Sequence, residues 1–220
     1  MTLNHYTLLS LIFLALSLMM KSIPLLEIET LKFFNSLMFN ETFFSYFTEI
    51  GNGLICLAIT IPLLSLISHK TTLNNVKAQT LVFVGIGVGV IVKGLKELTS
   101  IYAVRPGYYE FDDIVYLEPI YSFSSFPSGH AATMFSLFFV WISLSFRNIK
   151  IKYAGFLINM ILLFVLLVSL SRVVVAAHWL SDVLGSIAIA FLTLNAINMK
   201  VFRNILFESK VAKFSSFFLI

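Results

Sequence analysis

The chain has 220 residues, of which 59% are hydrophobic and only 12% are charged, with a formal net charge of +4 and a mean hydropathy of +0.94. These values lie far outside the range of water-soluble globular domains and exclude that class. The single cysteine, Cys56, excludes an internal disulfide and a cysteine metal cluster. The composition therefore predicts a protein of the lipid bilayer.

Apolar segments near bilayer-spanning length recur along the chain. A helix needs roughly 17 to 25 residues to cross the hydrocarbon layer. No Lys or Arg precedes the first segment and no small-residue cleavage site follows it, so we expect a retained helix. We expect an all-α, polytopic bundle of six transmembrane helices in one domain, residues 1–220. The predicted spans are Tyr6 to Ile23, Gly53 to Ile67, Ala78 to Val92, Ala131 to Phe146, Tyr153 to Leu170 and Val183 to Ile197.

The basic residues predict the orientation of the bundle. With six spans, the two termini and the segments 69–77 and 147–152 share one side, which holds nine of the fifteen Lys and Arg residues. By the positive-inside rule this side is cytoplasmic. Lys21 lies at the outer end of the first span, against the rule, and snorkelling to the interface is the explanation that the sequence offers. The tail at 200–220 mixes basic residues with phenylalanine, which suits an amphipathic helix on the inner leaflet.

Two external segments are rich in acidic residues. The second of them, from Tyr102 to Tyr121, carries five tyrosines and four acids, and an interfacial aromatic belt is the favoured interpretation. A lid that selects headgroups is an equal alternative, and a calcium or magnesium site at Asp112 and Asp113 is a weaker one. The acids of the first external segment are expected to be solvated; they are Glu27, Glu29, Glu41 and Glu49.

Two short segments carry the residues of a phosphoryl-transfer site. The first is Phe-Pro-Ser-Gly-His at Phe126 to His130, and in the second His178 is followed four residues later by Asp182. Four residues of helix place two side chains on one face, so Asp182 can hold one ring nitrogen of His178 and leave the other as a nucleophile toward phosphorus. His130 is a candidate for protonating the leaving oxygen.

Cationic and backbone groups suited to a phosphate accompany these side chains. Arg105 and Arg172 can supply positive charge around the equatorial oxygens. Ser128 and Gly129 immediately precede the fourth predicted helix, whose first unpaired amides favour an anion. An even number of crossings separates these residues, which places them on the non-cytoplasmic face. The expected substrate is therefore an amphiphile whose phosphate lies in the headgroup layer.

The combined pattern resembles the three signature motifs of the type 2 phosphatidic acid phosphatase superfamily, the integral-membrane lipid phosphate phosphatases related to vanadium haloperoxidases. The resemblance implies a metal-independent enzyme, without a cofactor, in which His178 attacks phosphorus, Asp182 orients it and His130 protonates the leaving group. It also implies phosphate-binding roles for Lys96, Arg105, Ser128, Gly129 and Arg172. The residues that carry the resemblance are Lys96 with Arg105-Pro106, Pro127 to His130, and Ser171-Arg172 with His178 and Asp182.

The first motif departs from the family pattern. Eight residues separate Lys96 from Arg105, two more than the family usually has. Lys93 lies one helical turn earlier on the same face and is the alternative phosphate ligand. We favour Lys96, because it lies nearer the interface and Lys93 is explained as a snorkelling residue.

These observations predict a lipid phosphate or diphosphate phosphatase that acts on the outer face of the inner membrane through a phosphohistidine intermediate. Undecaprenyl diphosphate and lipid A phosphate are the leading substrates, ahead of phosphatidylglycerophosphate and phosphatidic acid. A lipid phosphotransferase would share the intermediate and stays open. An anion transporter is less favoured, because the charged groups gather at one end of the helices and not at the midplane. So is a structural or partner-binding protein, and no nucleic acid partner is expected.

Overall fold

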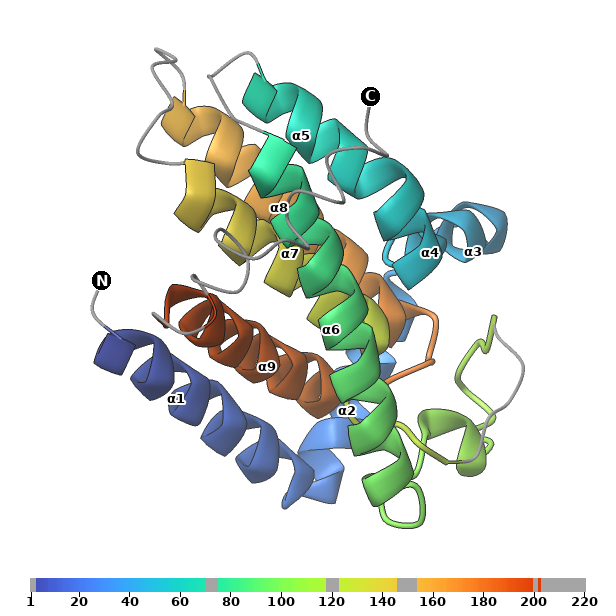
Figure 1. The fold of residues 1–220 in the computed structure, drawn as a ribbon. Helices are drawn as coiled ribbons and strands as arrows, with labels where there is room; N and C mark the ends of the chain where they lie inside the picture. The colour runs from blue at the N-terminus through green and yellow to red at the C-terminus, as the bar shows by residue number, and fades with distance from the viewer. Residues whose placement is uncertain (1–2, 70–74, 118–122, 146–153, 200–201, 203–220) are drawn as a thin grey trace.

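The computed structural model describes residues 3–69, 75–117, 123–145, 154–199 and 202 (Figure 1). Within these ranges every regular element is a helix and no strand occurs, so the all-α prediction is confirmed. The elements are α1 (Leu3–Lys21), α2 (Pro24–Ser36), α3 (Glu41–Glu49), α4 (Gly53–Ile55), the π-helical turn η1 (Cys56–Thr60), α5 (Ile61–His69), α6 (Asn75–Thr99), the 3₁₀ turn η2 (Pro106–Tyr108), α7 (Gly129–Ser145), α8 (Ala154–Val174) and α9 (Leu180–Asn198).

Each of the six predicted apolar segments is mostly helical over its described residues, but helix length does not establish the count of six spans. Among the described residues, three helices are long and apolar enough to cross a bilayer: Ala78–Thr99, Gly155–Val174 and Leu180–Asn198. Counting each of two bent helix pairs as one span raises the number to five. Helix α7 is apolar but has only 17 residues. The chain is thus a multi-pass membrane protein by its helices.

Two helices fill the segment between the first two predicted spans, which the sequence analysis treated as a solvated connection. Pro24 begins α2 and cannot continue α1, so the two helices meet at 97°. Asn40 begins α3 by accepting a hydrogen bond from the amide of Phe43 at 2.8 Å. Because α2 turns back against α9, Glu27 is only 6% exposed, and the expectation that all four acids of this segment are solvated is wrong for Glu27.

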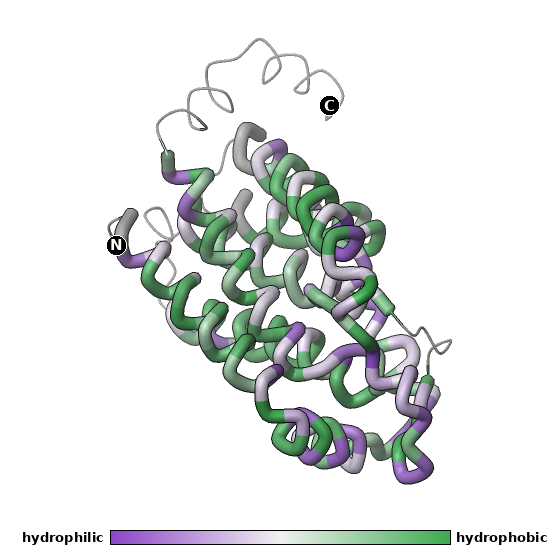
Figure 2. The backbone as a smooth tube through the Cα atoms, turned by 90° about the horizontal axis from the view of Figure 1, so that it is seen from below, coloured by the Kyte–Doolittle hydropathy of each residue, from purple (hydrophilic) through white to green (hydrophobic). Residues whose placement is uncertain are grey.

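Helix α7 is the central helix of the bundle. Eleven of its 17 residues are buried, and it packs against α6, α8 and α9. Helix α1 lies along the opposite side of α9 (Figure 1). Hydrophobic residues run along the helices, and hydrophilic residues gather toward their ends (Figure 2). The outer helices expose large apolar side chains, as lipid-facing surfaces do, among them Leu8 and Leu11 on α1, Val90 on α6, and Phe156 and Leu167 on α8.

The loop after α6 is tied to the bundle by Asn35 of α2. The side-chain amide of Asn35 donates to the carbonyls of Val115, at 2.9 Å, and of Val174, at 2.8 Å, and its oxygen accepts from the Val115 amide. Tyr102, Tyr108 and Tyr109 remain more than half exposed, in keeping with an aromatic belt. Some of the predictions fall on residues outside the described ranges: Glu118, Tyr121, residues 70–74 and 147–152 of the two basic segments and, apart from Phe202, the tail at 200–220.

Candidate active site

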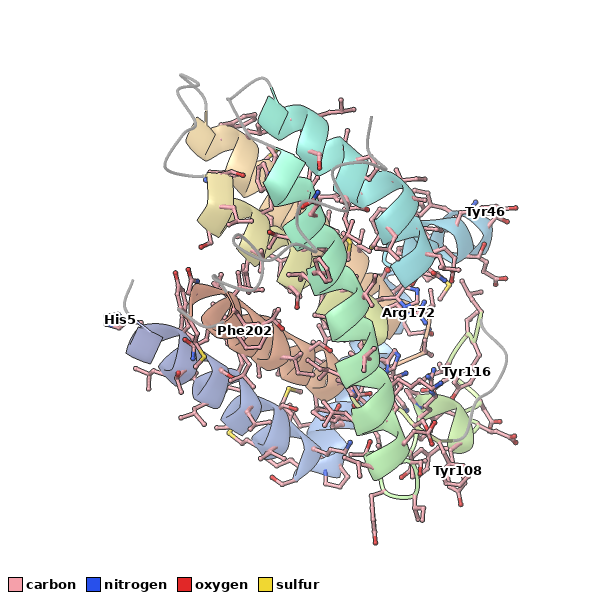
Figure 3. The ribbon with its side chains drawn as sticks, viewed as in Figure 1. His5, Tyr46, Tyr108, Tyr116, Arg172 and Phe202 are labelled. Atoms are coloured by element: carbon pink, nitrogen blue, oxygen red, sulfur yellow. The ribbon has the colours of Figure 1, made fainter. Side chains whose placement is uncertain are left out.

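Four helices bring their predicted site residues to one end of the bundle. These residues lie at the C-terminal ends of α6 and α8 and at the N-terminal starts of α7 and α9. Arg172 points toward the end of the molecule that carries Tyr108 and Tyr116, whereas His5 lies toward the other end (Figure 3). Arg172, His178, Lys96 and Arg105 are near enough to His130 for their charges to act on it. The residues singled out in the sequence therefore share one site.

The His178–Asp182 pair forms although His178 precedes the helix. Helix α9 begins at Leu180, and His178 lies in the loop after α8, where the amides of Ala177 and His178 both donate to the Arg172 carbonyl. His178 Nδ1 lies 3.3 Å from Asp182 Oδ2, and this oxygen also accepts from the Trp179 amide at 3.1 Å. Asp182 thus holds the histidine and caps the first turn of α9 at once. Both side chains are buried.

Serine residues join the starts of α7 and α9. The Ser125 hydroxyl donates to Asp182 Oδ2. Ser186, one turn along α9, donates to the carbonyl of Ser128 at 2.9 Å. Ser128 is fully buried immediately before α7, and a Cβ added to Gly129 would meet only Val92, at 3.6 Å. The first turn of α7 is therefore fixed beside the His178–Asp182 pair.

Arg172 is held from the N-terminal part of the chain. Its guanidinium is buried, and Nη1 donates a hydrogen bond of 2.8 Å to the hydroxyl of Thr48 on α3. Because α3 packs against α8, this contact joins two helices that are distant in the sequence. An arginine fixed in this way presents its charge in a defined direction.

Arg105 and Lys96 approach the site from the other side. Arg105 donates from Nε to the carbonyl of Phe123 and from Nη1 to the carbonyl of Ala177, both at 3.2 Å, which sets it next to the His178 loop. The charge of Lys96 acts on both histidines, whereas Lys93 is exposed. Lys96 is half-buried and Lys93 is exposed, and the choice of Lys96 over Lys93 as the phosphate ligand stays a prediction.

His130 is enclosed by the short loop between α3 and α4. Its Nε2 atom makes no hydrogen bond to the described residues and lies 3.9 Å from Glu49 Oε1. A Cβ added to Gly51 would lie 2.9 Å from His130 Cβ and 3.1 Å from Cδ2, closer than real side chains pack. The lack of a side chain at residue 51 is therefore what makes room for the His130 ring.

The electrostatic surroundings differ between the site and the neighbouring loop. Burial lowers the pKa of His178, whereas its hydrogen bond to Asp182 acts in the opposite direction; burial has the larger effect and favours the neutral ring.

At the surface, the Lys32 ammonium lies 2.7 Å from Asp113 Oδ2 and lowers the pKa of the Asp113 carboxyl. The described residues include no group of three His, Cys, Asp or Glu side chains suited to a metal ion. Asp113, one of the weaker cation candidates, is thus paired with a lysine.

Several residues at the site were not found by sequence analysis. Thr48, Glu49 and Gly51 come from the segment between the first two predicted spans, and Ser125 comes from the loop before α7. None stands at a diagnostic spacing from the histidines. Lys21 was noticed only because its charge opposes the positive-inside rule, and it lies 3.8 Å from Asp182 Oδ1.

Comparison with known proteins gives an independent result. The family model of the PAP2 superfamily matches residues 77–206, more than half of the chain. The fold resembles the crystal structure of a transmembrane PAP2-type phosphatidylglycerolphosphate phosphatase from Bacillus subtilis, with a TM-score of 0.64 and 21% identity, covering 87% of this chain and 93% of that one. It also resembles Aquifex aeolicus LpxE, with a TM-score of 0.59 and 22% identity, covering 77% and 92%. No curated protein matches the chain.

Proposed function

Because the chain belongs to the PAP2 superfamily, as its motifs predicted, we propose that it is a membrane phosphatase that removes inorganic phosphate from a lipid phosphate or a lipid diphosphate. The observation that carries this proposal is the His178–Asp182 pair, 3.3 Å apart, in one site with His130 and three cationic side chains. A buried, neutral imidazole fixed by a carboxylate is an activated nucleophile.

His178 Nε2 attacks phosphorus in the first step, while Asp182 holds Nδ1 and stabilises the positive charge that develops on the ring. The phosphorus–nitrogen bond forms as the bond from phosphorus to the leaving oxygen breaks, and His130 gives its proton to that oxygen. The leaving oxygen is the lipid oxygen of a lipid monophosphate, or the bridging oxygen of a lipid diphosphate. Water then attacks the phosphohistidine, and His130 takes a proton from this water. Inorganic phosphate leaves and both histidines return to their starting states.

The transferring phosphoryl group carries negative charge that this site can neutralise. Arg172, Arg105 and Lys96 surround the histidines, and the first amides of the 17-residue helix α7 follow Ser128 and Gly129. Fixed cations and helix-terminal amides stabilise an anionic transition state without having to reorganise. Because Gly129 has no side chain, the phosphate can approach the backbone closely at this position.

The position of the site supports a lipid substrate. The site lies where helices end, so a phosphate in the headgroup layer can enter while its tails remain among the lipids. From the positive-inside pattern we place the six-span chain in the inner membrane with this end outward. Undecaprenyl diphosphate and lipid A phosphate are the leading substrates, and phosphatidylglycerophosphate and phosphatidic acid follow.

A panel assay tests the proposal. Protein purified in detergent is incubated with each of the four lipids, and both inorganic phosphate and phosphorylated lipid products are measured. We expect phosphate release that His178→Ala reduces to background and that Asp182→Asn reduces in kcat more than in KM. Transfer of phosphate to a second lipid would identify the phosphotransferase alternative. Absence of turnover on every lipid, or full activity of His178→Ala, would overturn the proposal.

A further inference from the structure

Lys21 ends α1 at the same end of the bundle as the catalytic residues. Its Nζ atom lies 3.8 Å from Asp182 Oδ1, while its side chain remains 37% exposed. The family match begins at residue 77, so Lys21 lies outside the matched region. The cation therefore reaches the centre of the site from a part of the chain that the family model does not include.

The two oxygens of Asp182 have different surroundings. Oδ2 receives Ser125 Oγ, the Trp179 amide and His178 Nδ1. Oδ1 is buried and makes no hydrogen bond to the described residues, and Lys21 is its ion-pair partner there. A fully buried carboxylate without a nearby cation is costly, and an ammonium on the oxygen opposite the histidine offsets that cost while leaving Oδ2 for the ring.

The structure around Lys21 fixes where its ammonium lies. Helix α1 is joined to α9 by Ser10 Oγ, which donates to the Ala188 carbonyl at 3.0 Å, and by Ser17 Oγ, which donates to the Ser181 carbonyl at 2.7 Å. Ser17 is one helical turn before Lys21 on α1, so this second bond fixes the position of Lys21 relative to the start of α9. The ammonium also lies 5.5 Å from the centre of the Phe126 ring.

We propose that Lys21 is a positioning residue of the catalytic pair. Its ammonium keeps Asp182 ionised and holds the carboxylate in the orientation that presents Oδ2 to His178 Nδ1. Without this cation, Asp182 turns or protonates more easily, and His178 loses its orientation and the counter-charge for the imidazolium. This inference rests on the proposed function, because it concerns the same nucleophile.

The test is a double-mutant cycle on the purified protein, using the lipid of the panel that turns over fastest. Lys21→Met retains the length and packing of the side chain but removes the charge. We expect a loss of about 10-fold to 100-fold in kcat with little change in KM, which is the range typical of residues that orient a catalytic or metal-binding side chain without touching the substrate. Lys21→Arg should recover most of the activity. In an Asp182→Asn background, Lys21→Met should cost less than about threefold, because the partner is already neutral.

Two matched variants separate positioning from general stability. Lys32→Met removes another lysine ion pair from the N-terminal helices, the one with Asp113, and should leave kcat unchanged. Ser10→Ala weakens the attachment of α1 to α9 far from Lys21, and should lower the thermal unfolding temperature while leaving kcat unchanged. If Lys21→Met does not fold in detergent, Lys21→Gln takes its place in the same cycle.

The outcomes distinguish this inference from the proposed function. Turnover by the wild-type protein together with full activity of Lys21→Met would overturn the role of Lys21 alone. An equal loss from Lys21→Met in the wild-type and Asp182→Asn backgrounds would also overturn it, because the effect would not pass through Asp182. A wild-type protein that turns over no lipid in the panel would instead overturn the proposed function.

Discussion

Gly51→Ala tests whether the loop between α3 and α4 places the proposed general acid. The added methyl carbon would lie 2.9 Å from His130 Cβ, 3.1 Å from His130 Cδ2 and 3.2 Å from Val168 Cγ1. Carbon atoms pack best at about 3.5 to 4.0 Å, so the ring or the loop must shift by about 0.5 to 1 Å. A misplacement of about 1 Å at a reacting group costs on the order of 100-fold in rate, so we expect kcat/KM for the lipid phosphate to fall by about 10-fold to 100-fold.

The control for this variant is two residues away. A Cβ at Gly53, the first residue of α4, would meet nothing within 4 Å, so the same change in Gly53→Ala should retain wild-type activity. Overpacking at Gly51 also destabilises by about 1 to 3 kcal/mol, so thermal unfolding in detergent must show that the assayed Gly51→Ala protein is folded.

A second substrate separates displacement of His130 from general damage to the site. An activated aryl phosphate has a leaving group that needs little protonation, so Gly51→Ala should slow its hydrolysis much less than that of the lipid phosphate. An equal loss on both substrates would show that the nucleophile or the phosphate-binding residues had been disturbed. Wild-type rates on both would show that His130 does not depend on this contact, and the reasoning would be refuted.

Three further predictions follow from the same site. Thr48→Val removes the acceptor of the Arg172 hydrogen bond without changing the side-chain shape. It should lower kcat/KM by about tenfold or more, since a hydrogen bond to a charged group contributes about 1.5 to 3 kcal/mol. The control, Thr42→Val on the exposed face of α3, should leave kcat/KM unchanged. His130→Ala should slow the lipid phosphate more than an activated aryl phosphate, and comparable losses would contradict its role as the acid. Phosphate release should survive exhaustive chelation, and restoration by magnesium after a loss would contradict this.

The fold was predictable where it depends on local composition. Each of the six apolar segments is a helix, because backbone groups in hydrocarbon must pair within their own segment. Helices α2 and α3 were not predicted. Their mixed apolar and charged residues lack the long apolar run that marks a span, although Pro24 and the Asn40 cap are signals that a closer reading of helix starts could have used.

The contact between His178 and Asp182 was predictable because the two residues are near each other in sequence. Three residues separate His178 from Asp182, and the contact forms even though the helix begins only at Leu180. The residues that support the pair are far away along the chain. Thr48 and Arg172 are 124 residues apart, and no spacing rule joins residues at that distance before the helices are packed.

The charge pattern of the sequence did indicate one distant contact, that of Lys21. A lysine at the outer end of a first span opposes the positive-inside rule, and a residue that breaks a general preference needs a compensating local interaction. The structure supplies one in Asp182, whose second oxygen lies 3.8 Å from the Lys21 ammonium. Glu27 likewise departs from its expected place in solvent and lies buried beside Ser181, next to the same aspartate. Ionisable residues that contradict the expected topology of a membrane protein are therefore the ones to examine first for a partner in its active site.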